Sequence, residues 1–317
     1  MKLIRFFTKI LLIAIVPLLA IDGLRKADLA FDPRSGNAYL ATFIDKMHLL
    51  ETVPSPRLIL MSGSSMAFGV DSDLLSKELE IPVVNAALHF NLGSKFMMEQ
   101  LRSTVKKGDI VLITLEYVTT SQGKYEEQLL ISDFYPPAKK WIHFDSFTDE
   151  ISAYTTHRLS DCRLLVGEFW AGTRSKPISI EDTTSVFFRK CFDKNGDLVG
   201  HLNNPQPTFS NPELSTDIEF SKQIKDLNDF ATFAKQQGVT VLFTFPSYTE
   251  GGYEKNMPVV KKIEREFRKN LQFPILGTPE NSVLDDSFFF DNVYHLNAQG
   301  RKIFTSRLVQ LLEQEGV

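Results

Sequence analysis

Cysteine is scarce in this chain, which has only Cys162 and Cys191 among its 317 residues. Neither belongs to a Cys-x-x-Cys pair, and no cluster of histidine and cysteine has the spacing of metal ligands. We therefore predict no structural zinc, no other metal and no cofactor. The two cysteines fit either one disulfide in an exported protein or two buried thiols, and the sequence leaves both alternatives open.

The chain also lacks any block of one charge. Lys and Arg number 35 against 39 Asp and Glu, which gives a net charge of −4, and the basic residues are spread along the chain. Proteins that bind nucleic acid usually carry Lys and Arg clustered in a basic patch. This sequence has no such cluster, so we expect no nucleic-acid partner. The composition, 43% hydrophobic and 23% charged, is that of a globular protein with one large domain or two small ones.

The apolar run near the amino terminus is short for a membrane span. It extends from Ile10 to Ile21, or 12 residues, whereas a full span needs about 20. Lys2, Arg5 and Lys9 flank it, as in an export signal, and no small-x-small cleavage site follows. We predict an uncleaved signal anchor over residues 1–23, with the remainder extracytoplasmic. The alternatives are a cleaved signal peptide, which would make the protein secreted, and a buried N-terminal helix.

Short apolar runs alternate with helical patterns from residue 56 onward, after a linker and lead-in helix over residues 24–55. Strands are expected in "PRLILMSGSS", "IPVVNAA", "DIVLITLEY", "VTVLFTFP" and "FPILG". Such alternation predicts an α/β fold, a three-layer α/β/α sandwich with a central parallel sheet of about five strands over residues 56–317. Residues 119–210 break the rhythm and predict a mixed insertion. It contains a hairpin turn at Asn195-Gly196, with an apolar strand expected before the turn and "DLVGHL" after it.

Three polar residues are expected to cap helices of this core. Asp71, or Ser72 beside it, begins the helix after the first strand, and Asn297 begins the last helix. Asn211, with Pro212 in the first turn, is expected to begin a long helix that ends at Gly238.

Ligand sites in parallel sheets lie at the carboxyl ends of the strands. The first strand ends in "SGSSMAFGV", where small residues allow a sharp turn and place Ser64 or Ser65 near free helix amides that could stabilise an oxyanion. Met66 stands where the second glycine of a G-x-S-x-G elbow would be, so that motif is not matched. His89 and Tyr248 follow later strands and could line the same site, although for His89 we favour a structural role over contact with a substrate.

A carboxylate and a histidine lie four residues apart before the last helix, in "DNVYHLNAQG". Ser64, Asp291 and His295 occur in the order nucleophile, carboxylate, base, which is compatible with a catalytic triad. The alternative is that Asp291 and His295 only brace the start of the helix.

The "GSS" turn, the block "VVNAALHFNLG" and the block "DNVYHLNAQG" together resemble the SGNH/GDSL hydrolase superfamily. They are most similar to its membrane-anchored cell-envelope branch, which includes the D-alanine transfer protein of teichoic acid and the alginate O-acetylation proteins. The resemblance covers about residues 55–118 and 215–317 and implies a flavodoxin-like SGNH hydrolase fold.

The resemblance also implies roles for these residues. Ser64 would be the nucleophile, with Ser65 as its rival, His295 the general base and Asp291 the group that orients it. The implied function is an extracytoplasmic esterase or O-acyltransferase that acts on an acyl ester of an envelope glycan, or another small ester, through an acyl-serine. The alternative is a weakened domain that binds glycan or a membrane-bound acyltransferase.

Three departures from the family pattern stand out. Asp291 precedes His295 by four residues instead of three, a spacing that we expect one helical turn to accommodate. The oxyanion glycine of the second block is replaced at Phe90-Asn91. The asparagine donor of the third block is missing, because the third strand ends at Glu116. An ionised Glu116 would oppose an oxyanion, whereas a protonated one could donate to it.

Overall fold

The computed structural model describes residues 4–10, 12–13, 15–16, 19–20, 23, 36–171, 185–217 and 220–317. The chain divides into two compact units, and we call Met1–Ala41 with Tyr125–Arg189 the helical unit, and Thr42–Lys124 with Lys190–Val317 the sheet unit. Among the described residues, none of the helices combines the length and the apolar character that crossing a membrane requires. The anchor predicted over residues 1–23 lies partly outside the described residues.

The sheet unit is built on a parallel sheet. Its strands, in the order β2-β1-β3-β4, are β1 (Leu58–Met61), β2 (Val83–Asn85), β3 (Ile110–Ile113) and β4 (Thr240–Phe243). These confirm four of the expected strands. The fifth contributes only one parallel bridge, between Phe243 and Ile275, because Pro274 has no N–H to extend the ladder and Gly277 turns the chain with a φ of 64°. A separate pair of short parallel strands, β5 (Tyr248–Thr249) and β6 (Val283–Leu284), was not expected.

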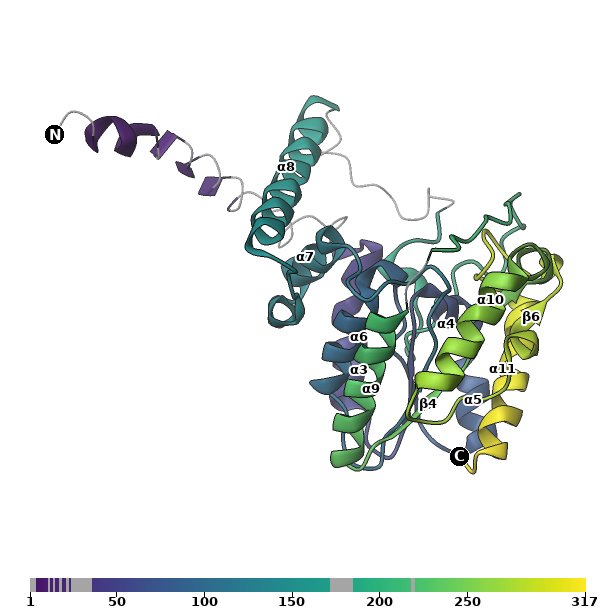
Figure 1. Ribbon diagram of the computed structural model, residues 1–317. Helices are drawn as coiled ribbons and strands as arrows, with labels where there is room; N and C mark the ends of the chain where they lie inside the picture. Colours follow the sequence, from purple (N-terminus) through teal and green to yellow (C-terminus); the bar gives the residue numbers. More distant parts are fainter. Residues whose placement is uncertain are drawn as a thin grey trace. The chain divides into compact units, whose positions relative to one another are not determined.

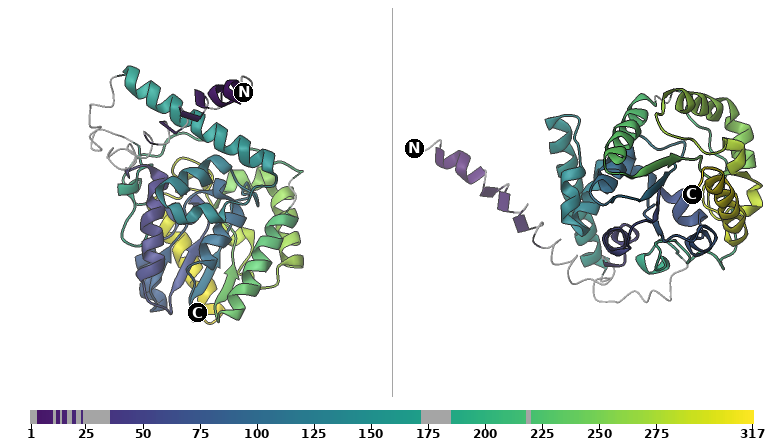
Figure 2. Two further views of the ribbon diagram at one scale, coloured as in Figure 1. Left: turned by 90° about the vertical axis from the view of Figure 1, so that its left-hand side faces the viewer. Right: turned by 90° about the horizontal axis from the view of Figure 1, so that it is seen from below.

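Helices cover both faces of this sheet, which confirms the three-layer α/β/α arrangement. In Figures 1 and 2, α6 (Gly93–Arg102) and α9 (Ser221–Gln236) lie together on one face, and α5 (Ser72–Leu79) and α11 (Ala298–Gln314) lie together on the other. The sheet unit also contains α3 (Phe43–Thr52), α4 (Ser64–Gly69) and α10 (Glu250–Asn270). The four side chains of β1 are at most 1% exposed, which explains its unbroken apolar sequence.

Two of the predicted helix caps are confirmed. Asp71 accepts the Leu74 amide at the start of α5, and Asn297 accepts the amides of Gln299 and Gly300 at the start of α11. Asn297 fixes where the loop that carries His295 joins the last helix.

The helix predicted from Asn211 is wrong at its start, since α9 begins only at Ser221. The side chain of Asn211 bonds to Thr249 and Asp286 instead. The amide of Leu214 is satisfied by the side chain of Asn256. Contacts with distant parts of the chain therefore keep residues 211–215 out of the helix, against their local helical pattern.

The predicted insertion contributes to both units. Its middle part forms α7 (Tyr125–Phe134), the 3-10 helix η3 (Pro136–Trp141) and α8 (Phe147–Ala171) of the helical unit. Residues 190–210 belong to the sheet unit, where a turn with Gly196 at φ 89° is closed by an antiparallel bridge between Phe192 and Leu198. The segment before this turn is the 3-10 helix Arg189–Cys191 and not the expected strand. Cys162 and Cys191 are both free thiols.

Candidate active site

Ser64 lies directly beyond the carboxyl end of β1, as the first residue of α4. Its side-chain oxygen is 2.8 Å from His295 Nε2, although the two residues are 231 positions apart in the sequence. The Ser65 hydroxyl is instead 3.4 Å from the Ser62 hydroxyl. Of the two candidate serines, the structure therefore brings Ser64 to the imidazole, and Ser64 remains 7% exposed.

Asp291 lies on the other side of the imidazole, with its Oδ1 2.7 Å from His295 Nδ1. The carboxylate can only accept, so Nδ1 carries the hydrogen and Nε2 presents a lone pair to the Ser64 hydroxyl. The two residues do not share a helical turn, so that expectation is wrong. They lie in a loop closed by a bridge between Phe289 and Leu296 and by the Phe290 amide, which donates to the His295 carbonyl at 2.7 Å.

Asn292 shapes this loop, and sequence reasoning missed it. Its Oδ1 accepts the backbone amides of Tyr294 and His295 at 2.8 and 3.2 Å, which makes the chain turn between Asp291 and His295. Its amide nitrogen lies 2.8 Å from His295 Nδ1. His295 Nδ1 carries only one hydrogen, so it can donate only one hydrogen bond. We assign this bond to the Asp291 carboxylate, because charge-assisted hydrogen bonds are the stronger ones.

The face of the imidazole is covered by Phe68, a second residue that the sequence reasoning missed. The two rings are stacked, with centroids 3.6 Å apart and an interplanar angle of 3°. Phe68 lies four residues after Ser64 on α4, so the two share one helix face, and this spacing was the available signal. The stack limits the tilt of the imidazole between Ser64 and Asp291.

His201 supports the same loop from within the core. Its Nε2 donates to the Leu296 carbonyl at 2.8 Å, and its ring packs 4.8 Å from Phe68. Burial lowers the pKa of His201 to about 4. The side chain is therefore neutral at pH 7 and adds no positive charge beside His295.

Glu116 follows β3 and binds the nucleophile turn. Its Oε1 accepts the Ser65 amide at 2.7 Å and its Oε2 accepts the Gly63 amide at 3.1 Å. The Thr119 hydroxyl donates to Oε2 at 3.3 Å. Both oxygens therefore act as acceptors toward the protein, which does not fit the alternative in which Glu116 donates to an oxyanion.

His89 and Asn91 belong to the neighbouring turn, after β2. His89 Nδ1 accepts the Asn91 amide at 3.3 Å, which caps the 3-10 helix η2 (Phe90–Leu92). This turn lies against the nucleophile turn, because a Cβ added to Gly63 would be 2.6 Å from the Phe90 nitrogen. The Asn91 amide is thus bonded within its own turn, and the Phe90 amide is the one that faces Gly63.

Tyr248 lies behind the site and does not line an open cleft. Its side chain is fully buried, its hydroxyl accepts from the Asn256 side chain at 3.1 Å, and its ring packs 5.1 Å from that of Tyr294. Burial raises the pKa of Tyr248 to about 12, so it stays protonated. Tyr248 therefore packs against Tyr294, the residue that precedes His295.

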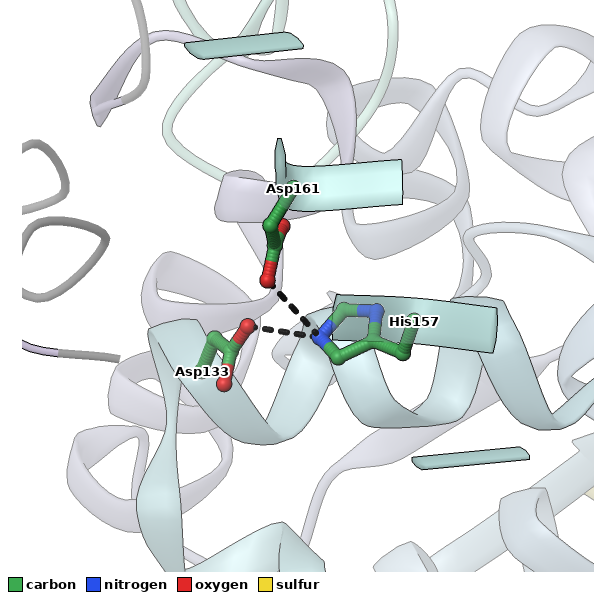
Figure 3. A group of neighbouring side chains, drawn as sticks. All are labelled: Asp133, His157 and Asp161. Carbon is green, nitrogen blue, oxygen red and sulfur yellow. Dashed lines mark hydrogen bonds and ion pairs between the residues drawn. The ribbon is translucent and has the colours of Figure 1, made fainter. Parts of the chain in front are cut away.

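One group of three potential metal ligands occurs among the described residues, in the helical unit. Figure 3 shows Asp133, His157 and Asp161, whose ligand atoms lie within 4.8 Å of one another. His157 Nε2 is 2.8 Å from Asp133, and Asp161 is paired with Arg158 at 3.1 Å. These pairs account for the cluster without a metal, and the absence of a metal site stays a prediction from the sequence.

No known family profile and no curated protein matches this sequence. The solved structures that are similar to it include three at 9% identity. One, from Desulfitobacterium hafniense, is described as a lipolytic protein of the G-D-S-L family; 80% of this chain and 98% of that chain are covered, with a TM-score of 0.38. A second, from Streptococcus pneumonia, is described as a platelet activating factor, with coverages of 86% and 91% and a TM-score of 0.42. A third, from Bacteroides fragilis, is described as an acylhydrolase, with coverages of 86% and 93% and a TM-score of 0.38. These likenesses are too distant to assign an activity, and the proposal below rests on the geometry of the site.

Proposed function

We propose that this chain is a serine esterase or O-acyltransferase that works through an acyl-Ser64 intermediate. The observation that carries the proposal is the hydrogen-bonded series from Ser64 through His295 to Asp291, with distances of 2.8 and 2.7 Å. A nucleophile, a base and a group that orients the base are what acyl transfer requires.

In this mechanism the Ser64 oxygen attacks the carbonyl carbon of an ester while its proton passes to His295 Nε2. Asp291 holds Nδ1–H and stabilises the imidazolium. The tetrahedral intermediate then collapses, the C–O bond to the alcohol breaks, and Nε2 returns the proton to the departing alcohol. Water or an acceptor hydroxyl next gives its proton to Nε2 and attacks the acyl-serine. The bond between the acyl carbon and the Ser64 oxygen then breaks, and Nε2 returns the proton to that oxygen.

The oxyanion needs hydrogen-bond donors near Ser64. The backbone N–H of Ser64 makes no hydrogen bond to any residue that the structure describes, so it is available. The Phe90 amide, which lies against Gly63, is the second candidate. These two amides would replace the glycine and asparagine donors that the sequence lacks.

The substrate is proposed to be a short acyl ester of an envelope glycan or a similar small ester. The support is the resemblance of the three sequence blocks together with the charged and apolar pattern of residues 1–23. That pattern also leads us to propose a membrane-anchored, extracytoplasmic protein, with a membrane-bound acyltransferase as a candidate partner.

A second candidate function is a binding module that has lost catalysis. The observation that favours it is Glu116, a carboxylate bonded to the amides on both sides of Ser64, where a hydrolase needs donors and not negative charge.

Hydrolysis of p-nitrophenyl acetate by the detergent-purified full chain separates the two functions. If the chain is an esterase, the wild type should hydrolyse the substrate, Ser64→Ala and His295→Ala should lose this activity, and the matched variant Ser65→Ala should keep it. Equal, background-level hydrolysis by all four proteins, each folded by circular dichroism, would leave the binding module.

A further inference from the structure

We infer that Glu116 is a positioning residue that holds the nucleophile Ser64 by bonding the amides of the residues before and after it. The inference rests on the proposed function, because it concerns how Ser64 is presented for acyl transfer. This positioning role differs from the two that the sequence suggested for Glu116, those of a charge opposing the oxyanion and of a protonated donor.

The geometry is that of a clamp made by one carboxylate. Oε2 accepts from Gly63 N at 3.1 Å and Oε1 accepts from Ser65 N at 2.7 Å, so the two oxygens span Ser64 along the backbone. The carboxylate is itself fixed, because Glu116 is 2% exposed and Thr119 donates to Oε2 at 3.3 Å. A buried acceptor that satisfies two otherwise orphaned amides restricts the turn strongly.

The clamp is one of two reasons why Gly63 is a glycine, since a Cβ there would also lie 2.6 Å from the Phe90 backbone nitrogen. A Cβ at this position would lie 2.5 and 2.4 Å from the two oxygens of Glu116, closer than side chains approach. Only a residue without a side chain lets the carboxylate come so near the backbone. Gly63 and Glu116 therefore form one device, although 53 residues separate them in the sequence.

The clamp decides which amides can stabilise an oxyanion. In nucleophile elbows the amide of the residue after the nucleophile serves this purpose. Here that amide belongs to Ser65 and is bonded to Glu116. The oxyanion must consequently rely on the Ser64 amide and its neighbours, and the contribution of Glu116 is to hold Ser64 Oγ against His295 and not to bind the substrate.

The variants Glu116→Gln and Glu116→Asp test the clamp. Glutamine keeps the shape but has only one acceptor oxygen, and aspartate keeps the charge but is too short to reach both amides. Glu264→Gln is the matched control, since Glu264 is also a largely buried glutamate with two hydrogen-bonded partners, Lys261 and Arg268. Hydrogen exchange of a peptide covering residues 62–68 reports the clamp itself, independently of activity. The saturation kinetics of a fluorophosphonate probe on the full chain give its maximal labelling rate and its half-saturating concentration separately.

We expect faster exchange of residues 62–68 in both Glu116 variants, with the rest of the chain protected as in the wild type. The maximal labelling rate should fall by about tenfold or more, since two bonds to a charged acceptor are weakened. The half-saturating concentration should change less than twofold. A general loss of structure would instead alter both the maximal labelling rate and the half-saturating concentration. Glu264→Gln should match the wild type in both measurements.

Unchanged exchange at residues 62–68 in the Glu116 variants would overturn the clamp. Faster exchange with labelling as fast as in the wild type would overturn the positioning role. Full labelling by Glu116→Asp but not by Glu116→Gln would show that charge matters and bridging does not. A folded wild type that the probe never labels would contradict the proposed function. The exchange data would still show whether Glu116 restrains the turn at residues 62–68.

Discussion

His201 should make the sheet unit sensitive to mild acid. Its side chain is 1% exposed, its Nε2–H donates to Leu296, and burial lowers its pKa from 6.5 to about 4. Between these values the unfolded chain binds a proton that the folded protein does not, so stability falls as the pH falls. The part of the free energy of unfolding that depends on a neutral His201 is fully present above pH 6.5 and is lost as the pH falls toward 4. The gap corresponds to at most about 3 kcal/mol in the free energy of unfolding, of which about 2 kcal/mol is lost at pH 5.

The variant His201→Gln tests this magnitude, because glutamine can donate to Leu296 but does not titrate. We would measure the free energy of unfolding in urea at pH 7.5, 6 and 5. Between pH 7.5 and 5 the wild type should lose about 2 kcal/mol more than the variant, and the exposed-residue control His48→Gln should follow the wild type. Parallel curves for the wild type and His201→Gln would refute the reasoning.

Three further substitutions have defined outcomes. Asp291→Asn removes the charge that holds His295 Nδ1–H, so fluorophosphonate labelling of the folded protein should slow by about hundredfold or more; labelling within threefold of wild type would contradict the triad. Phe68→Leu keeps an apolar side chain but loses the ring stack on His295, and the labelling rate should fall by about threefold to tenfold without a shift of its pH optimum. Arg301→Gln leaves the fully buried Asp197 without its cationic partner at 2.6 Å, so urea unfolding should show a loss of about 3–5 kcal/mol, in part restored by adding Asp197→Asn.

The core of the fold followed from local sequence. Continuous apolar runs predicted the strands because both faces of the sheet are covered, and the caps Asp71 and Asn297 mark their helices through bonds to nearby amides. The start of α9 could not be predicted, because Asn211 is bound by residues 38 and 75 positions away. Local pattern is a weak guide where distant side chains satisfy the backbone.

The candidate site was predictable in its members but not in its geometry. Ser64, Asp291 and His295 have the residue types expected for a nucleophile, an orienting carboxylate and a general base, so the sequence alone could suggest them. Phe68 and Glu116 act through contacts that only the folded chain creates, and an aromatic residue or a glutamate after a strand is common without such a role.

The most direct test of the account is the intact mass of the full chain after reaction with a fluorophosphonate probe. We expect one adduct per wild-type chain and per Ser65→Ala chain, and none on folded Ser64→Ala or His295→Ala. An adduct that persists in Ser64→Ala, or the absence of any adduct on the folded wild type, would contradict an acyl-Ser64 mechanism.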